Sequence, residues 1–188
     1  MNTVFVKSYT EPRFDEKEIL RYAMCKEPDE QVTALLNECL KEIQSKLVYK
    51  VCYIEASADS FFNNVDSKLL NDYFADCRSY ILFAATIGIE IDRLITKYNR
   101  ISPAKAQMIQ AIGAERAEAL CDLFCADMKT QYVNIKPRIS PGYGDMPLEM
   151  QRKVFSLLDC PRKIGLTLND SMLMSPSKSV TAFIGVLK

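Results

Sequence analysis

Hydrophobic positions along the 188-residue chain switch between helical and extended spacing. In residues 28–47 the apolar side chains recur every three or four positions, which is the spacing of one helix face. Residues 48–56 are rich in β-branched and aromatic side chains and predict a strand. The nearly continuous apolar run of residues 78–87 predicts a second, buried strand. The longest helical pattern begins at Pro103 and continues to about residue 133.

Weaker patterns surround these elements. They predict a short strand or extended arm in 1–14, a helix after Phe14, helices at 67–74, 89–98 and 147–158, a turn at 160–163, and strands at 164–168 and 180–187. Helices and strands thus alternate without the regular rhythm of a parallel βαβ sheet, so we expect an α+β fold. Neither common glycine-rich phosphate loop is present.

The composition narrows the functions that this chain can have. It contains 24 Lys and Arg residues, 24 Asp and Glu residues and no histidine. Without an imidazole, a Ser-His-Asp triad and a histidine-ligated zinc, haem or cobalt site are excluded. A balanced charge lacks the basic excess that duplex binders use to neutralise phosphates, so we expect no nucleic-acid partner.

The seven cysteines are scattered and form no C-x-x-C pair. Free thiols in a reducing cytoplasm are the expectation for such a pattern. The N-terminal residues lack the apolar core of a signal peptide, and no stretch reaches the roughly 20 apolar residues of a membrane span. We therefore expect a cytoplasmic protein without a membrane partner.

A Pro- and Gly-rich segment, residues 134–147, is the first candidate for chemistry. Its Ser140-Pro141-Gly142-Tyr143 sequence predicts a type II turn, with Pro fixing one φ and Gly supplying a positive one. Arg138 offers a fork for a carboxylate or phosphate, and Tyr143 an aromatic face. The simpler interpretation is a surface turn with an exposed Arg and a packed Tyr.

Glu115, Glu118 and Asp122 form a second candidate because their spacing places them on one face of the long helix. Three carboxylates facing a cleft would hold an ammonium or sulfonium group, whereas the simpler interpretation is a solvated helix face. On the same helix Cys121 and Cys125 have the spacing of half a metal site. No second half is evident, so we expect them to pack as small apolar side chains.

Two ordered motifs then resemble a known family. They are Arg138-x-x-x-Gly142-Tyr143 and, downstream, Met174-x-Pro176-x-x-Ser179-Val180, preceded by an Ala117-Glu118-Ala119 helix. This order resembles the C-terminal reactivation (activation) domain of cobalamin-dependent methionine synthase. Residues 81–188 carry the motifs and residues 1–80 match weakly, and we expect residues 1–188 to form one domain.

The resemblance implies a twisted antiparallel sheet with long helices that binds S-adenosylmethionine. Such a domain supports the reductive methylation of cob(II)alamin, with the cobalamin held by a corrinoid-binding methionine synthase chain and the electron supplied by a flavodoxin-type donor. By the same resemblance Arg138 pairs with the ligand carboxylate and Glu118 lies near the ligand. Residues Ser140, Pro141 and Gly142 contact the adenosyl part, with Tyr143 beside it.

Two departures from the family pattern leave alternatives open. Ile184 stands where the family often has a ligand-holding Tyr, and the chain has no Trp, so the N-terminal Asp-Trp motif is missing. The corrinoid module is also absent, which predicts docking on a separate chain. A non-catalytic docking module that has lost its ligand, or a small-molecule sensor, are the competing interpretations.

Overall fold

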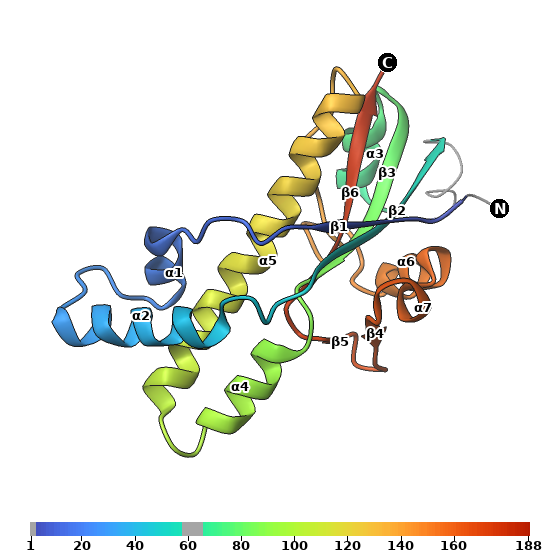
Figure 1. Ribbon diagram of the computed structural model, residues 1–188. Helices are drawn as coiled ribbons and strands as arrows, with labels where there is room; N and C mark the ends of the chain where they lie inside the picture. Colours follow the sequence, from blue (N-terminus) through green and yellow to red (C-terminus); the bar gives the residue numbers. More distant parts are fainter. Residues whose placement is uncertain (1–2, 58–65) are drawn as a thin grey trace.

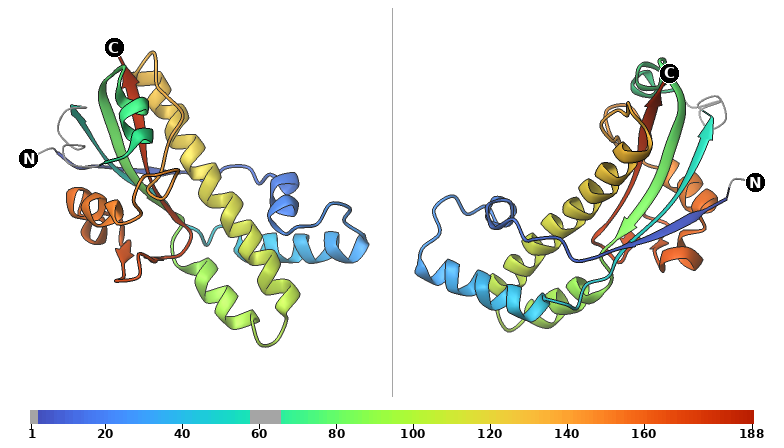
Figure 2. Two further views of the ribbon diagram at one scale, coloured as in Figure 1. Left: turned by 180° about the vertical axis from the view of Figure 1, so that it is seen from behind. Right: turned by 45° about the horizontal axis from the view of Figure 1, so that its top comes forward.

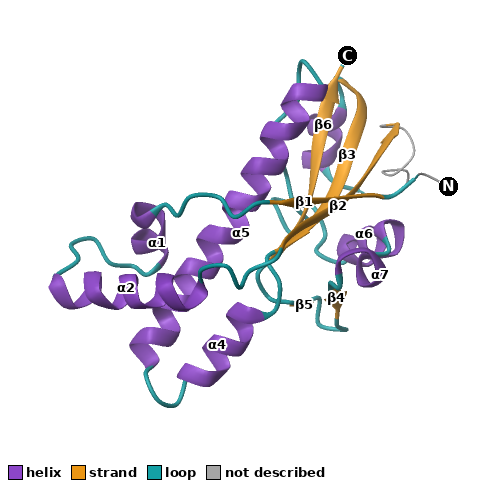
Figure 3. Ribbon diagram, in the orientation of Figure 1, coloured by secondary structure: helices purple, strands orange, loops and turns teal. Residues whose placement is uncertain are grey.

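A computed structural model describes residues 3–57 and 66–188 (Figure 1). Helices surround a central group of strands, as Figure 3 shows. The elements are β1 (Phe5–Tyr9), α1 (Glu16–Tyr22), α2 (Glu30–Ile43), β2 (Tyr49–Ser57), α3 (Lys68–Phe74), β3 (Cys77–Thr86), α4 (Glu90–Tyr98), α5 (Pro103–Gln131), α6 (Met150–Leu158), α7 (Cys160–Ile164), β4 (Thr167–Leu168), β5 (Met174–Ser175) and β6 (Ser179–Leu187).

The central sheet has the strand order β1-β2-β3-β6, and every neighbouring pair is antiparallel. β4 and β5 form a separate two-stranded ribbon. The expected α+β fold with an antiparallel sheet and a long helix is confirmed. β6, the last strand of the chain, pairs with β3, so the sheet joins segments that lie about a hundred residues apart in the sequence.

Helices cover both faces of the sheet. Figure 2 shows α5 on one side and α6 with α7 on the other. Ile81 and Phe83 of β3 lie in the core beneath α5, where the Phe83 ring packs 4.7 Å from that of Phe124. Tyr80 and Leu82 face the second core, beneath α6 and α7. Because both faces of β3 are buried, its sequence is a continuous apolar run without alternation.

Helix starts follow local sequence signals. The side chain of Asp15 accepts hydrogen bonds from the Lys17 and Glu18 backbone amides (3.0 and 3.2 Å), and this caps α1. Asp29 caps α2 in the same way through the Val32 amide (2.8 Å). These caps satisfy amide groups that have no partner within the helix.

Three predictions near the C-terminus are wrong in detail. Residues 160–163, predicted as a turn, form helix α7, which Asp159 separates from α6 by adopting a left-handed φ of 48°. Of the strand predicted at 164–168, only Thr167–Leu168 is extended, because α7 continues to Ile164. The helix predicted from Pro147 begins at Met150, after a tight turn closed by the Met150 amide and the Pro147 carbonyl (3.3 Å).

Candidate functional site

Arg138 lies in a segment that runs along the outer edge of β6. The Lys136 amide donates to the Gly185 carbonyl (2.9 Å), and Ile139 exchanges two backbone hydrogen bonds with Phe183 (3.0 and 2.8 Å). These bonds attach residues 135–139 to the edge of the sheet without forming a regular strand. Arg138 is therefore held between two anchored neighbours.

Tyr73 of α3 completes this attachment from a distant part of the sequence. Its hydroxyl donates to the Pro137 carbonyl (2.6 Å) and accepts from the Gly185 amide (3.0 Å), so it bridges β6 and the segment before Arg138. A Cβ on Gly185 would lie 2.6 Å from the Cys77 sulfur and 3.1 Å from the Tyr73 ring. The absence of a side chain at 185 therefore permits the bridge.

The segment ends in the predicted type II turn. The Tyr143 amide donates to the Ser140 carbonyl (3.0 Å), and Gly142 has a φ of 92°, as this turn requires. Pro141 is buried, whereas Gly142 and Tyr143 are exposed, with 56% of Tyr143 accessible. The turn prediction is confirmed, and the tyrosine ring stands at the surface.

Arg138 forms ion pairs with two carboxylates of α5. Its Nη1 lies 2.6 Å from Asp122 Oδ1, and its Nη2 contacts Glu118 Oε2. The burial of the guanidinium opposes its charge, but the hydrogen bond to Asp122 and the nearby anionic groups raise its pKa overall. The structure thus brings together Arg138 of the first sequence candidate with Glu118 and Asp122 of the second.

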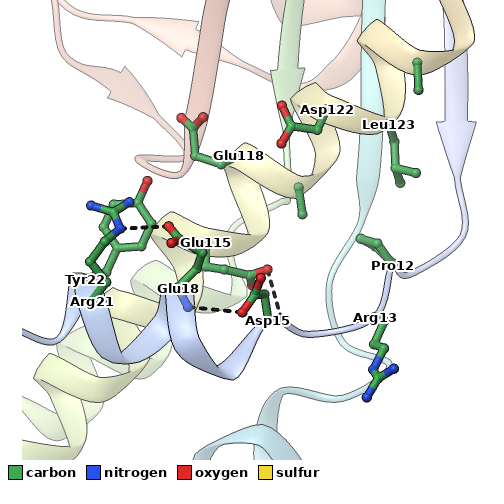
Figure 4. A pocket seen from close by; sticks show the side chains of 12 residues that line it. Pro12, Arg13, Asp15, Glu18, Arg21, Tyr22, Glu115, Glu118, Asp122 and Leu123 are labelled. Atoms are coloured by element: carbon green, nitrogen blue, oxygen red, sulfur yellow. Dashed lines mark hydrogen bonds and ion pairs between the residues drawn. The ribbon is translucent and has the colours of Figure 1, made fainter. Parts of the chain in front are cut away.

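A cavity of about 570 Å³ lies beside these carboxylates, between α5 on one side and α1 with the preceding N-terminal arm (residues 10–15) on the other (Figure 4). It is lined by Pro12, Arg13, Asp15, Glu18, Arg21, Tyr22, Glu115, Glu118, Ala119, Asp122, Leu123 and Ala126. Its volume falls within the usual range for small-molecule sites. Half of the lining comes from residues 12–22, which the sequence could not assign to the site.

A second cavity, of about 420 Å³, includes Arg138 in its lining. It is lined by Cys125, Lys129, Ile135, Lys136, Pro137, Arg138 and Tyr143. Arg138 therefore belongs to the basic second cavity while its two partners belong to the acidic first one. Ser140, Pro141 and Gly142 line neither of these two cavities and instead shape the turn that carries Tyr143.

Glu115 contradicts the interpretation of the three carboxylates as a solvated helix face. It is buried and accepts hydrogen bonds from the fully buried guanidinium of Arg116. Arg116 also donates to the carbonyls of Pro12 and Arg13 (2.5 and 2.9 Å) and lies 4.2 Å from the centre of the Phe14 ring. This pair attaches the N-terminal arm to α5 and so builds one wall of the first cavity.

Two further residues that the sequence singled out, Cys121 and Ile184, are buried in the hydrophobic core. Cys121 is buried in the core beneath α5, where burial raises its pKa, and the predicted packing role is confirmed. Ile184 is also fully buried in that core, so its side chain reaches neither cavity. Among the residues that the structure describes, no group of three or more Cys, Asp or Glu side chains is arranged to hold a metal ion.

None of the helices in residues 3–57 and 66–188 is both long and apolar enough to cross a membrane.

Comparison with known proteins places the fold. The solved structure of the MetH reactivation domain bound to AdoHcy is similar to this chain, with a TM-score of 0.68 and 15% sequence identity. The alignment covers 99% of this chain and 79% of that one, so the fold similarity includes the N-terminal residues whose sequence matched weakly. At this identity the similarity shows the fold alone.

The family is shown by the sequence itself. Residues 55–186 match the profile of the family described as "Vitamin B12 dependent methionine synthase, activation domain". This range contains both ordered motifs, the long helix α5 and all but the last residue of β6. The chain therefore belongs to the family of vitamin B12-dependent methionine synthase activation domains.

Proposed function

We propose that this chain binds S-adenosylmethionine and supports the reductive methylation of cob(II)alamin held by a corrinoid-binding methionine synthase chain. The family match over residues 55–186 is the observation that carries the proposal. In addition, the similar solved domain has AdoHcy bound. We further propose that the two proteins dock as separate chains and that a flavodoxin-type protein supplies the electron.

The charges around Arg138 support a ligand of this kind. S-adenosylmethionine carries a sulfonium, an ammonium and a carboxylate. The carboxylates of the first cavity suit the two cationic groups, and the guanidinium suits the carboxylate. Tyr143, exposed beside Arg138 in the second cavity, offers a face on which the adenine ring can stack. We therefore propose that the ligand spans both cavities.

The proposed role needs little acid-base chemistry. A sulfonium is an activated methyl donor and cob(I)alamin is a strong nucleophile, so the domain contributes mainly by holding the methyl group in the right place. A chain without histidine is suited to this task. Arg138, Glu118 and the turn at 140–143 would orient the ligand.

Isothermal titration calorimetry with S-adenosylmethionine tests ligand binding. We expect binding to the wild-type protein and a loss of about tenfold or more in Arg138→Ala, because a charge-assisted bidentate contact is removed. Arg152→Ala is the matched control, since Arg152 is an exposed arginine outside both cavities. Absence of binding by the wild type, even with a corrinoid protein present, would contradict the proposal.

Reconstitution tests the repair reaction itself. The chain, a corrinoid-binding methionine synthase fragment, S-adenosylmethionine and reduced flavodoxin are combined, and the cob(II)alamin absorption is followed. We expect conversion to methylcobalamin that depends on this chain. No dependence on the chain would refute its proposed role in repair.

A docking module without a ligand is the second candidate function. Two observations favour it: Arg138 is already paired with two protein carboxylates, and Ile184 is buried where the family often has a ligand-holding tyrosine. This alternative predicts that the chain captures a corrinoid protein equally well with and without S-adenosylmethionine. Methylation of cobalt in the reconstituted system would exclude it.

A further inference from the structure

The fork of Arg138 is occupied by the protein's own carboxylates. Each of its two terminal nitrogens faces a different one, Nη1 facing Asp122 and Nη2 facing Glu118. A ligand carboxylate uses the same donors in a bidentate contact. A ligand carboxylate that takes both terminal nitrogens therefore competes with both protein carboxylates, and this contact forms when at least one of them moves away.

Asp122 is the carboxylate that can leave at the lower cost. Its side chain is 73% exposed, compared with 45% for Glu118 and 22% for Arg138. Ion pairs of exposed side chains contribute little because water solvates both partners when they separate. In Figure 4 both carboxylates project from the same side of α5, one turn apart, at the border of the first cavity.

The charged side chains around the first cavity, counted together with their ion-pair partners, carry one negative charge in excess. The first cavity is lined by five carboxylates (Asp15, Glu18, Glu115, Glu118, Asp122) and two arginines (Arg13, Arg21). Arg116 and Arg138 each pair with carboxylates of this lining and so bring the number of positive charges to four. When the ligand carboxylate takes Arg138, two carboxylates of the lining are left without a counter-charge. The ligand ammonium neutralises one of them, and the charge that remains is that of the released Asp122.

Methyl transfer changes the net charge of the ligand. S-adenosylmethionine has two positive groups and one negative group, a net charge of +1. S-adenosylhomocysteine has lost the sulfonium with the methyl group and is neutral overall. An uncompensated carboxylate at the cavity border attracts the first and not the second.

We propose that Asp122 is a specificity-determining residue that closes the Arg138 fork in the empty site and, once displaced, selects the sulfonium-containing donor over its demethylated product. This inference rests on the proposed binding of S-adenosylmethionine. It explains how one site takes up the donor and releases the product after the transfer, since the charge that favours the donor is lost with the methyl group.

The test compares the dissociation constants of both ligands, measured by calorimetry on the wild type, Asp122→Asn and Asp122→Glu. In Asp122→Asn we expect the preference for S-adenosylmethionine over S-adenosylhomocysteine to fall by roughly fivefold. The product itself should bind at least as tightly as it does to the wild type, because a competitor for Arg138 is removed. Asp122→Glu, which keeps the charge, should retain the preference.

Asp170→Asn is the control, since it makes the same chemical change at an exposed position outside both cavities. An unchanged preference in Asp122→Asn, with both ligands still binding, would overturn this inference and leave the proposed function standing. Equal weakening of both ligands would also overturn it, because Asp122 would then only support the site. Failure of both ligands to bind the wild type would overturn the inference and the proposed function together.

Discussion

Two arginines neutralise the carboxylates on one face of α5, and they do so in opposite surroundings. Arg116 is fully buried, pairs with Glu115 and donates to two backbone carbonyls of the N-terminal arm. Arg138 is partly exposed and contacts two carboxylates that water also reaches. A buried pair cannot exchange partners without a large cost, whereas a solvated pair can. The buried pair of Arg116 therefore stabilises the fold, whereas the solvated contacts of Arg138 can be exchanged for contacts with a ligand.

Removing the buried arginine should have the largest effect. Arg116→Met leaves Glu115 buried without its counter-charge and two carbonyls without a donor, so we expect a loss of about 3–5 kcal/mol in the free energy of unfolding. Urea denaturation measures this loss. Arg93→Met is the control, because Arg93 is exposed and pairs only with Glu90 among the described residues (2.5 Å), and it should cost less than about 1 kcal/mol. Similar costs for the two variants would refute the contrast.

Glu42 forms ion pairs with Lys97 and Lys105, and the contribution of these pairs to stability depends on pH. Burial opposes its charge, but hydrogen bonds from Lys105, Tyr98 and Lys97 outweigh that cost and lower its pKa from 4.5 to about 2. Since the pKa is lower in the folded state, the stabilisation is complete above about pH 4.5 and is lost as the pH falls towards 2.

Glu42→Gln should therefore cost about 1–3 kcal/mol at pH 7 and almost nothing at pH 2. The measurement is the free energy of unfolding of both proteins between these pH values. If the difference between them does not change with pH, the ionised form of Glu42 is not the source of the stabilisation.

Removing the Tyr73 hydroxyl should lower the stability of the fold by a smaller amount and should also loosen the segment that carries Arg138. Tyr73→Phe leaves the Pro137 carbonyl and the Gly185 amide without their shared partner, and we expect a loss of about 1–2 kcal/mol. We also expect weaker binding of S-adenosylmethionine, because the segment before Arg138 is less firmly held. Tyr132→Phe, which removes an exposed hydroxyl bonded to Glu55, is the control and should leave ligand binding unchanged.

The smallest effect on stability is expected for the exchangeable arginine. Arg138→Met should lower the free energy of unfolding by less than about 1 kcal/mol, because its partners are solvated once it is gone. Thermal and urea denaturation measure this change. A loss as large as that of Arg116→Met would mean that Arg138 also serves the fold, and the distinction between the two arginines would disappear.

Local sequence signals account for much of the fold. Apolar periodicity predicted α2 and α5, the continuous apolar run predicted β3, and the proline and glycine of residues 140–143 predicted a turn that the structure confirms. Helix α7 was missed because its five residues are too few for a periodic pattern. Each successful prediction depended on neighbours within a few positions of the chain.

The candidate site was predictable only in part, because its remaining contacts are long-range. The residue types and spacing pointed to Arg138, Glu118 and Asp122, but nothing in them indicated that these residues bind each other. Tyr73 reaches Pro137 across 64 positions, and Arg116 reaches Pro12 across 104. The one usable signal for Tyr73 was Gly185, a glycine in the interior of a strand, which often marks a close approach by another group.

The attachment of residues 135–139 to β6 has a consequence for the order of events during synthesis. Arg138 leaves the ribosome well before Phe183 and Val186, the β6 residues that anchor its segment. Strand β3 likewise pairs with β6, which is synthesised later. Helix α5 depends on local contacts, whereas the backbone bonds that hold the segment of Arg138 at the sheet edge require β6. The part of the molecule proposed to receive the methyl donor therefore depends on β6 for its anchoring.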